Sequence, residues 1–279
     1  MKNAIHMLMP PTQRRQMNSF VITTEDGRLI VVDGGYRADA EYLLSYLKDL
    51  TGALRPRVDA WILTHPHKDH VDAFLEIVRE HWEEIDLGTV YFKFPSVQFF
   101  AHEGMETDAD AVNMLNGFYA LLPRFADRIC IVTAGDVYDV GAARLEILYT
   151  SDDTIVCNIS NNASVVFKLT LGGRSALFTA DAGVEAGQRL LERYGETGAL
   201  RCEICQMAHH GQNGCDRAFY EAVHPRICLW CAPGWLWDND KGGGFDTHIW
   251  KTVKVRRWME ALGVTENYVA KDGTQVLEL

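Results

Sequence analysis

The sequence has no apolar stretch that approaches the roughly 18 residues of a membrane-spanning helix. Its first residues lack the apolar core and small-residue cleavage site of a signal peptide. Positive charge is scarce, because 27 Lys and Arg against 38 Asp and Glu leave a net charge of −11. These absences exclude a membrane partner and a global field that attracts nucleic acid, and they predict a cytoplasmic protein.

The seven cysteines form an odd set, which argues against a complete disulfide framework and suits a reducing compartment. Two Cys-x-x-Cys pairs, Cys202 with Cys205 and Cys228 with Cys231, invite comparison with a zinc ribbon. Both pairs lie inside strand-like runs, where residues three apart point to opposite faces. We therefore expect them to be small buried residues in neighbouring strands.

Four potential metal ligands lie within one hexad, H-P-H-K-D-H at residues 65–70, which directly follows an apolar run. A strand ending at Thr64 would project His65 and His67 toward the same side, where one divalent ion can bind. Asp69 and His70 come where the chain turns into the next helix, so they can bind a second ion. Two ions roughly 3.5–4 Å apart are typical of two-metal hydrolysis.

Hydrophobic patterning predicts one α/β domain over residues 1–279, with two mixed β-layers and helices outside them. An Asp-Gly turn joins strands at 20–23 and 29–32, and leucines at helical spacing follow at 41–50. The polar and aromatic stretch 76–123 is predicted to be an insertion that lines the substrate mouth. Further strands are expected at 129–133, 145–149, 164–169, 176–179 and 227–230, with helices at 109–122, 185–194 and 248–262.

More potential ligands stand at the ends of later strands. Asp181 follows the apolar run 176–180, and His209 and His210 end another strand just before a glycine. A lone Asp at a strand end is commonly a turn or helix-capping residue. Together with the hexad, however, these three residues complete the kind of donor set that two divalent ions need.

With these motifs, the chain resembles the metallo-β-lactamase superfamily over nearly its whole length. The resemblance rests on D-G-G at 33–35, the hexad, F-T-A-D at 178–181 and H-H-G at 209–211. Within the superfamily it looks most like the competence-type DNA-internalisation hydrolases, because N-N-A-S at 161–164 and D-T-H at 246–248 also match. Phosphorylcholine esterases of teichoic acid look similar in the same stretches.

The resemblance implies an αββα sandwich with a dinuclear site at its edge and two divalent ions, zinc first and manganese as the alternative. Carried over, His65 and His67 would bind the first ion and Asp69 and His70 the second. Asp181 would bridge the ions. Either of the paired histidines, His209 or His210, would complete a shell.

The sequence departs from the superfamily pattern at two places. Asn161 or Asn162 stands where the middle histidine ligand is expected, which leaves the first ion short of one imidazole and keeps manganese open. Ala180 replaces the usual glycine before the bridging Asp181. His67 argues against redox chemistry, because the di-iron, oxygen-reducing members tend to carry a glutamate there.

The expected chemistry is attack by a metal-bridging hydroxide on a phosphodiester, either a nucleic acid, a nucleotide or a phosphorylcholine-type ester. Asp69 would shuttle the proton. The leaving oxygen needs an acid, for which the candidates are His248 and whichever of the His209 and His210 pair is not a ligand. His248 can equally be a helix-start residue without a catalytic role.

Substrate contacts are predicted from charge and aromaticity. Lys251 and Lys254 belong to a basic cluster that can hold phosphate, or that simply forms a solvated helix face. Trp235 and Trp237 can wall a nucleobase or a quaternary ammonium, or pack on the sandwich. The substrate is therefore expected to be a small or polymeric phosphodiester, with nucleic acid as substrate only.

Two other functions remain open from the sequence. One is hydrolysis of a carboxylic ester, lactone or thioester. The other is a non-catalytic module that binds metal for sensing or binds nucleic acid, which the missing middle histidine makes conceivable.

Overall fold

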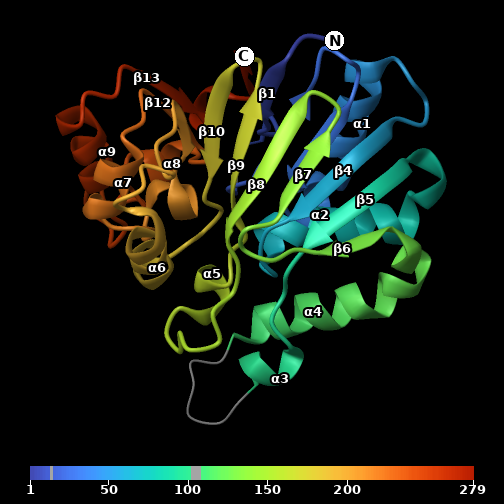
Figure 1. The fold of residues 1–279 in the computed structure, drawn as a ribbon, viewed down its shortest axis with the longest axis horizontal. Helices are drawn as coiled ribbons and strands as arrows, with labels where there is room; N and C mark the ends of the chain where they lie inside the picture. The colour runs from blue at the N-terminus through green and yellow to red at the C-terminus, as the bar shows by residue number, and fades with distance from the viewer. Residues whose placement is uncertain (13–14, 102–107) are drawn as a thin grey trace.

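The computed structural model describes residues 1–12, 15–101 and 108–279. Two seven-stranded sheets lie face to face, and helices cover both outer faces (Figure 1). The first sheet has the order β14-β1-β2-β3-β4-β5-β6, and the second has the order β13-β12-β11-β10-β9-β8-β7. This αββα sandwich confirms the predicted fold class.

The strands of the first sheet are β1 (Ala4–Met7), β2 (Ser19–Thr23), β3 (Leu29–Asp33), β4 (Arg57–Leu63), β5 (Asp86–Phe92), β6 (Ile129–Ile131) and β14 (Gln275–Glu278). The strands of the second sheet are β7 (Val137–Val140), β8 (Ala143–Tyr149), β9 (Val166–Leu171), β10 (Arg174–Phe178), β11 (Ile204–Gln206), β12 (Ile227–Trp230) and β13 (Glu266–Val269). The helices on the first sheet's side are α1 (Ala40–Thr51), α2 (Lys68–Glu80), α3 (Val97–Phe100) and α4 (Ala109–Leu121). Those on the second sheet's side are α6 (Val184–Tyr194), α7 (Arg217–Val223), α8 (Gly234–Trp237) and α9 (Thr252–Ala261). The short α5 (Ile159–Asn162) contacts α6, and its Ile159 belongs to the apolar cluster on the first sheet's side.

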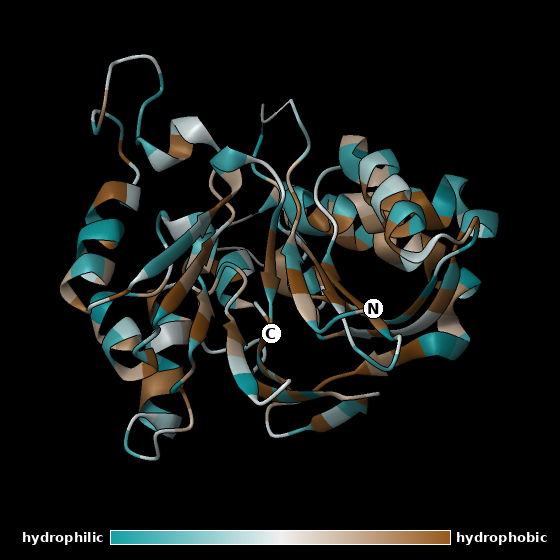
Figure 2. Cartoon of the chain, turned by 90° about the horizontal axis from the view of Figure 1, so that it is seen from above, coloured by the Kyte–Doolittle hydropathy of each residue, from teal (hydrophilic) through white to brown (hydrophobic). Residues whose placement is uncertain are grey.

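Three apolar clusters separate the four layers. The cluster between the sheets includes Phe20, Phe167 and Phe178, all fully or almost fully buried. The other two clusters join the first sheet to α1, α2 and α4, and the second sheet to α6, α7 and α9. Figure 2 shows apolar strands between flanking helices that have mixed hydropathy. Strands buried on both faces read as continuous apolar runs, which explains their strong sequence signal.

Local signals set much of this architecture. The β2–β3 hairpin turns at Gly27, whose φ of 85° suits glycine, and Val21 pairs with Val31 across it. The Leu-rich helix is α1, and the strand that precedes the hexad is β4. Four strands are too short for their sequence pattern to predict them, namely β1, β7, β13 and β14. β14 forms one edge of the first sheet by pairing with β1.

The predicted insertion at 76–123 is wrong over its first part. Residues 86–92 are β5, which lies in register beside β4 in the first sheet, because their apolar residues are buried on the sheet. Residues 76–80 are the end of α2, and the two helices that follow β5, α3 and α4, lie outside the sandwich strands, with α4 packed against α2. Whether these two helices shape substrate choice stays a prediction.

Among the described residues, the two Cys-x-x-Cys pairs do not form a group of potential metal ligands. Cys205 and Cys228 face each other as register partners in β11 and β12, and all four cysteines are buried free thiols. Within the described parts of the chain, the helices are too short or too polar to cross a lipid bilayer.

Candidate metal centre

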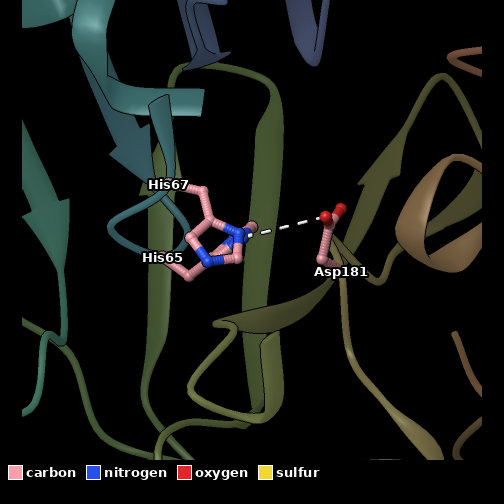
Figure 3. Close-up of side chains that lie close together, drawn as sticks. All are labelled: His65, His67 and Asp181. Carbon is pink, nitrogen blue, oxygen red and sulfur yellow. Dashed lines mark hydrogen bonds and ion pairs between the residues drawn. The ribbon is translucent and has the colours of Figure 1, made fainter. Parts of the chain in front are cut away.

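The first ligand group forms where β4 ends. The chain leaves the sheet at Leu63, and the His67 N–H donates to the His65 carbonyl at 3.0 Å in a tight turn. His65 Nε2 and His67 Nδ1 consequently lie 3.1 Å apart. Figure 3 shows the two rings side by side, opposite the Asp181 carboxylate. The turn, rather than strand alternation, therefore brings the two histidines together.

The second group combines the start of α2 with a distant loop. Asp69 and His70 lie in the first turn of α2, and both are buried. His210 contributes the third member, its Nε2 lying 3.0 Å from Asp69 Oδ2. Ligand atoms within each group, His65 with His67 and Asp181, or Asp69 with His70 and His210, lie within 4.8 Å of one another.

Asp181, which follows β10 and belongs to the first group, also lies close to the second group. Its Oδ1 lies 3.2 Å from His70 Nε2, and its Oδ2 lies 3.8 Å from His65 Nε2 and 3.5 Å from His210 Nε2. The turn that presents this carboxylate places Ala180 at a φ of 47°, a left-handed conformation that glycine adopts without strain. The position of one carboxylate between two groups suits a ligand shared by two ions.

The paired histidines differ in their placement. They belong to the 3₁₀ turn η5 (Ala208–Gly211), where His209 and His210 take φ values of 52° and 56°. Consecutive left-handed residues are strained, and such strain clusters at functional sites. This turn directs His210 into the second group. His209 joins neither group, and its Nε2 lies 3.7 Å from Asp181 Oδ2.

Buried charges of opposite sign control ionisation in the cluster. Burial would raise the pKa of Asp181, but the neighbouring His70 and His210 hold it well below its usual range. Burial would lower the pKa of His70, yet Asp181 and Asp33 raise it to about 10. Burial, followed by the neighbouring His70, lowers the pKa of His65. Protons on His70 and His210 thus balance the carboxylates, and divalent ions that bind here must displace them.

The donor set fits divalent ions. Buried polar atoms are almost always hydrogen-bonded in folded proteins. Within the described residues, His70 Nε2, Asp181 Oδ1 and His210 Nε2 are buried without a partner of hydrogen-bond geometry. These atoms lie close to one another instead, with His70 Nε2 at 3.2 Å from Asp181 Oδ1 and His210 Nε2 at 3.5 Å from Asp181 Oδ2. Imidazole and carboxylate groups arranged this way are typical ligands of zinc and related ions.

The two asparagines at the expected middle-ligand position have different surroundings. Asn162 is a structural residue, because its Oδ1 accepts from the Gly183 and Ala186 N–H groups at the start of α6 and its Nδ2 donates to Glu185. Asn161 lines a cavity of about 240 Å³ with His67, and its buried Oδ1 has no partner among the described residues. Of the two, only Asn161 is available to a ligand.

Sequence reasoning missed two carboxylates that form hydrogen bonds with the predicted metal-binding histidines. Asp33, in D-G-G, accepts from His70 Nδ1 at 2.7 Å. Asp108 lies 2.8 Å from His67 Nε2 and accepts from Ser160 Oγ at 2.7 Å. The D-G-G motif was a signal for the first. Nothing local marks the second, because Asp108 is 41 positions from its histidine.

The predicted substrate residues lie on the α8 and α9 side. Lys251 and Lys254 line a cavity of about 310 Å³ together with Gln212 and Arg217, and α9 packs against η5. His248 precedes α9 rather than starting it, and its ring lies 4.0 Å from that of Trp250. No contact joins it to either ligand group in the described parts of the chain.

The two predicted tryptophans pack within the protein. Trp237 stands edge-on to Trp230, with ring centroids 5.3 Å apart, and the Arg256 guanidinium covers it at 4.0 Å. Trp235 packs on Trp250 at 5.0 Å. Both remain part-exposed, so a role as a substrate wall stays a prediction.

An αββα sandwich whose His and Asp groups meet at one edge defines a class of metal-binding proteins, and comparison with known proteins agrees. The chain belongs to the metallo-β-lactamase superfamily, whose family model matches residues 12–214. No match was found among the curated proteins.

Several solved structures share the fold at low sequence identity. The metallo-β-lactamase fold protein YhfI from Bacillus subtilis is 13% identical, with 99% of this chain and 100% of that chain covered and a TM-score of 0.57. The diiron β-hydroxylase CmlA from Streptomyces venezuelae is 14% identical, with a TM-score of 0.60. The alignment covers 100% of this chain but only 54% of CmlA. Zn²⁺-bound PqqB from Methylobacterium extorquens is 13% identical, with coverage of 98% and 89% and a TM-score of 0.56.

Proposed function

We propose that the protein is a metal-dependent hydrolase that cleaves phosphodiesters. The observation that carries this proposal is the Asp181 carboxylate, which faces both ligand groups at 3.2 to 3.8 Å. Two divalent ions held there would supply an activated water and polarise the phosphoryl oxygen. Zinc suits the imidazole-rich groups best, and manganese is the alternative.

Two side chains of this protein would transfer protons during the reaction, one from the attacking water and the other to the leaving oxygen. Asp69 lies in the second group, beside His210, where it can hold the proton of the attacking water. His209 is outside both groups yet 3.7 Å from Asp181, and its side chain is 19% exposed. We therefore assign the proton donor for the leaving oxygen to His209 in preference to His248.

The positive charge of the cavity of about 310 Å³ on the α9 side favours an anionic substrate. Lys251, Lys254 and Arg217 line it with one carboxylate, Asp216, which already accepts from the Phe219 N–H as the N-cap of α7. This cavity, which is lined by the residue that follows η5, Gln212, can bind a phosphate group. A lactone or neutral carboxylic ester has no anion for these cations to bind.

The test compares ion-loaded wild type with Asp181→Ala and with Asp127→Ala, a matched control at an exposed aspartate. Wild type loaded with Zn²⁺ or Mn²⁺ should hydrolyse bis(p-nitrophenyl) phosphate, and a panel of single-stranded DNA, phosphorylcholine esters and lactones should rank the substrates. Loss of Asp181 should lower turnover by more than about 100-fold and reduce bound metal, whereas Asp127→Ala should match wild type. Absence of diester cleavage in the wild type, or faster lactone cleavage, would overturn the proposal.

A further inference from the structure

Asp108 sits where three segments meet at the mouth of the first ligand group. It is the N-cap of α4, and its Oδ1 accepts from the Ala111 N–H at 3.0 Å. Its other oxygen, Oδ2, lies 2.8 Å from His67 Nε2 and 2.7 Å from Ser160 Oγ. The carboxylate therefore connects the start of α4 to the start of α2 and to α5.

The direction of these hydrogen bonds fixes the histidine tautomer. An ionised carboxylate only accepts, so His67 must donate through Nε2–H. Asp108 also accepts from the Ala111 N–H and from the Ser160 hydroxyl, which is how an ionised carboxylate binds its neighbours. A neutral imidazole that carries its proton on Nε2 has its lone pair on Nδ1. That is the atom 3.1 Å from His65 Nε2, inside the first ligand group.

We propose that Asp108 is a positioning residue that holds His67 in the tautomer and orientation needed to bind the first ion. The inference rests on the proposed metal site. Carboxylates that accept from the second nitrogen of a ligand histidine are known to fix its ring and raise its basicity. Asp108 would do so from a segment outside the sandwich strands.

His67 needs such a partner more than the other ligands do. Its side chain is 20% exposed, whereas the side chains of His65 and His70 are fully buried. Packing thus holds the buried rings, and Asp33 also fixes His70 through Nδ1. At the exposed position, hydrogen bonding must replace packing to keep the ring oriented.

The neighbouring Asp110 provides a matched comparison. It lies in the first turn of α4 and pairs with Lys68 at 2.5 Å, but its side chain is 58% exposed and makes no hydrogen bond to a ligand histidine among the described residues. Asp110→Asn and Asp108→Asn each remove one formal negative charge from the same end of α4. The two positions therefore separate a general charge effect from the specific bond to His67.

The decisive variant is Asp108→Asn, with Asp110→Asn as its control. Asparagine is a good N-cap, so its oxygen can still accept from the Ala111 N–H and preserve α4. Its NH₂ group then faces His67, which must accept through Nε2 and carry its proton on Nδ1. Long-range ¹H–¹⁵N NMR of the chelator-treated protein at about pH 8.5, where an ordinary imidazole is neutral, reports this tautomer directly.

Wild type and Asp110→Asn should show the Nε2–H form of His67, and Asp108→Asn the Nδ1–H form. Zn²⁺ titration against a competing chelator should show that Asp108→Asn weakens one of two ions by about 10- to 100-fold, while the other ion and the melting temperature stay unchanged. The inference would be overturned if His67 kept its wild-type tautomer in Asp108→Asn, or if both Zn²⁺ affinities of Asp108→Asn equalled those of Asp110→Asn. If wild type binds no Zn²⁺, the metal site fails, but the tautomer still decides whether Asp108 positions His67.

Discussion

Replacement of Asp33 by alanine should destabilise the protein strongly even without bound ions. Asp33 is fully buried, and its two oxygens accept four hydrogen bonds. Thr64 donates through its N–H at 2.8 Å and its hydroxyl at 2.7 Å, Asn18 donates through Nδ2 at 2.8 Å, and His70 is bound through Nδ1 at 2.7 Å. The alanine variant removes the acceptor of all four donors in a buried site, where the Thr64 hydroxyl has longer contacts in reserve, to His65 Nδ1 at 3.3 Å and His70 Nδ1 at 3.4 Å.

The expected loss follows from these bonds. An unmet buried donor costs about 1–3 kcal/mol, and removing one partner of a buried ion pair costs about 3–5 kcal/mol. The four bonds share one carboxylate, so the costs do not add, and we expect a loss of about 4 kcal/mol. Asp33→Asn keeps one acceptor and should lose about half as much.

Urea unfolding followed by circular dichroism in excess chelator measures this effect without any contribution from bound ions. With a slope of about 3 kcal/mol per molar urea, the alanine variant should shift the midpoint by more than about 1 M. Asp86→Ala serves as control, because that carboxylate is 38% exposed and pairs with Arg57 at the surface. A loss below about 1 kcal/mol for Asp33→Ala, no greater than expected for the surface pair, would refute the reasoning.

Three further predictions test the proton donor, the η5 turn and a surface ion-pair cluster. His209→Ala should lower kcat for bis(p-nitrophenyl) phosphate by about 10²- to 10⁴-fold with both ions still bound, and His248→Ala should leave kcat unchanged. The reverse result would make His248 the proton donor. Gly211→Ala should cost more than about 2 kcal/mol in urea unfolding, because φ is 81° and an added Cβ would meet the Trp230 ring at 2.4 Å; full wild-type stability would contradict the close approach. Two arginines lower the pKa of Glu203 from 4.5 to about 2, so its stabilising effect is complete above pH 4.5 and is lost as the pH falls through about 2. Glu203→Gln should therefore be less stable than wild type by under about 1 kcal/mol at pH 7, with the difference gone near pH 2; a difference that is constant with pH would exclude this linkage.

Elements with strong local patterns were predictable. The β2–β3 hairpin, α1, β4 and β12 follow from apolar periodicity and a turn signal, which depend only on neighbouring residues. β5 was assigned to an insertion because its alternating burial is weaker. The strands β1 and β14 were missed because each is short and gains its stability from pairing with the other end of the chain.

The candidate site likewise has residues that the sequence predicts and residues that it does not. The four ligand-type residues of the hexad, Asp181 and the two paired histidines were predictable because ligand chemistry depends on residue type and on position at the end of a strand. Six of these seven residues come together in two groups. The sequence left the choice between His209 and His210 open, and it offered Asn162 as a neighbour of the metal although its amide is used to hold the start of α6.

The sequence by itself determined the fold class and the kinds of atom that could bind an ion, because periodicity and donor chemistry are local properties. The tertiary structure alone decided which atoms converge. The left-handed backbone of η5 selects His210 for the second group, and α4 delivers Asp108 to His67 across 41 positions. Such choices depend on distances of a few tenths of an ångström, and on the angles between distant segments, which only the packing of the two sheets and their helices fixes.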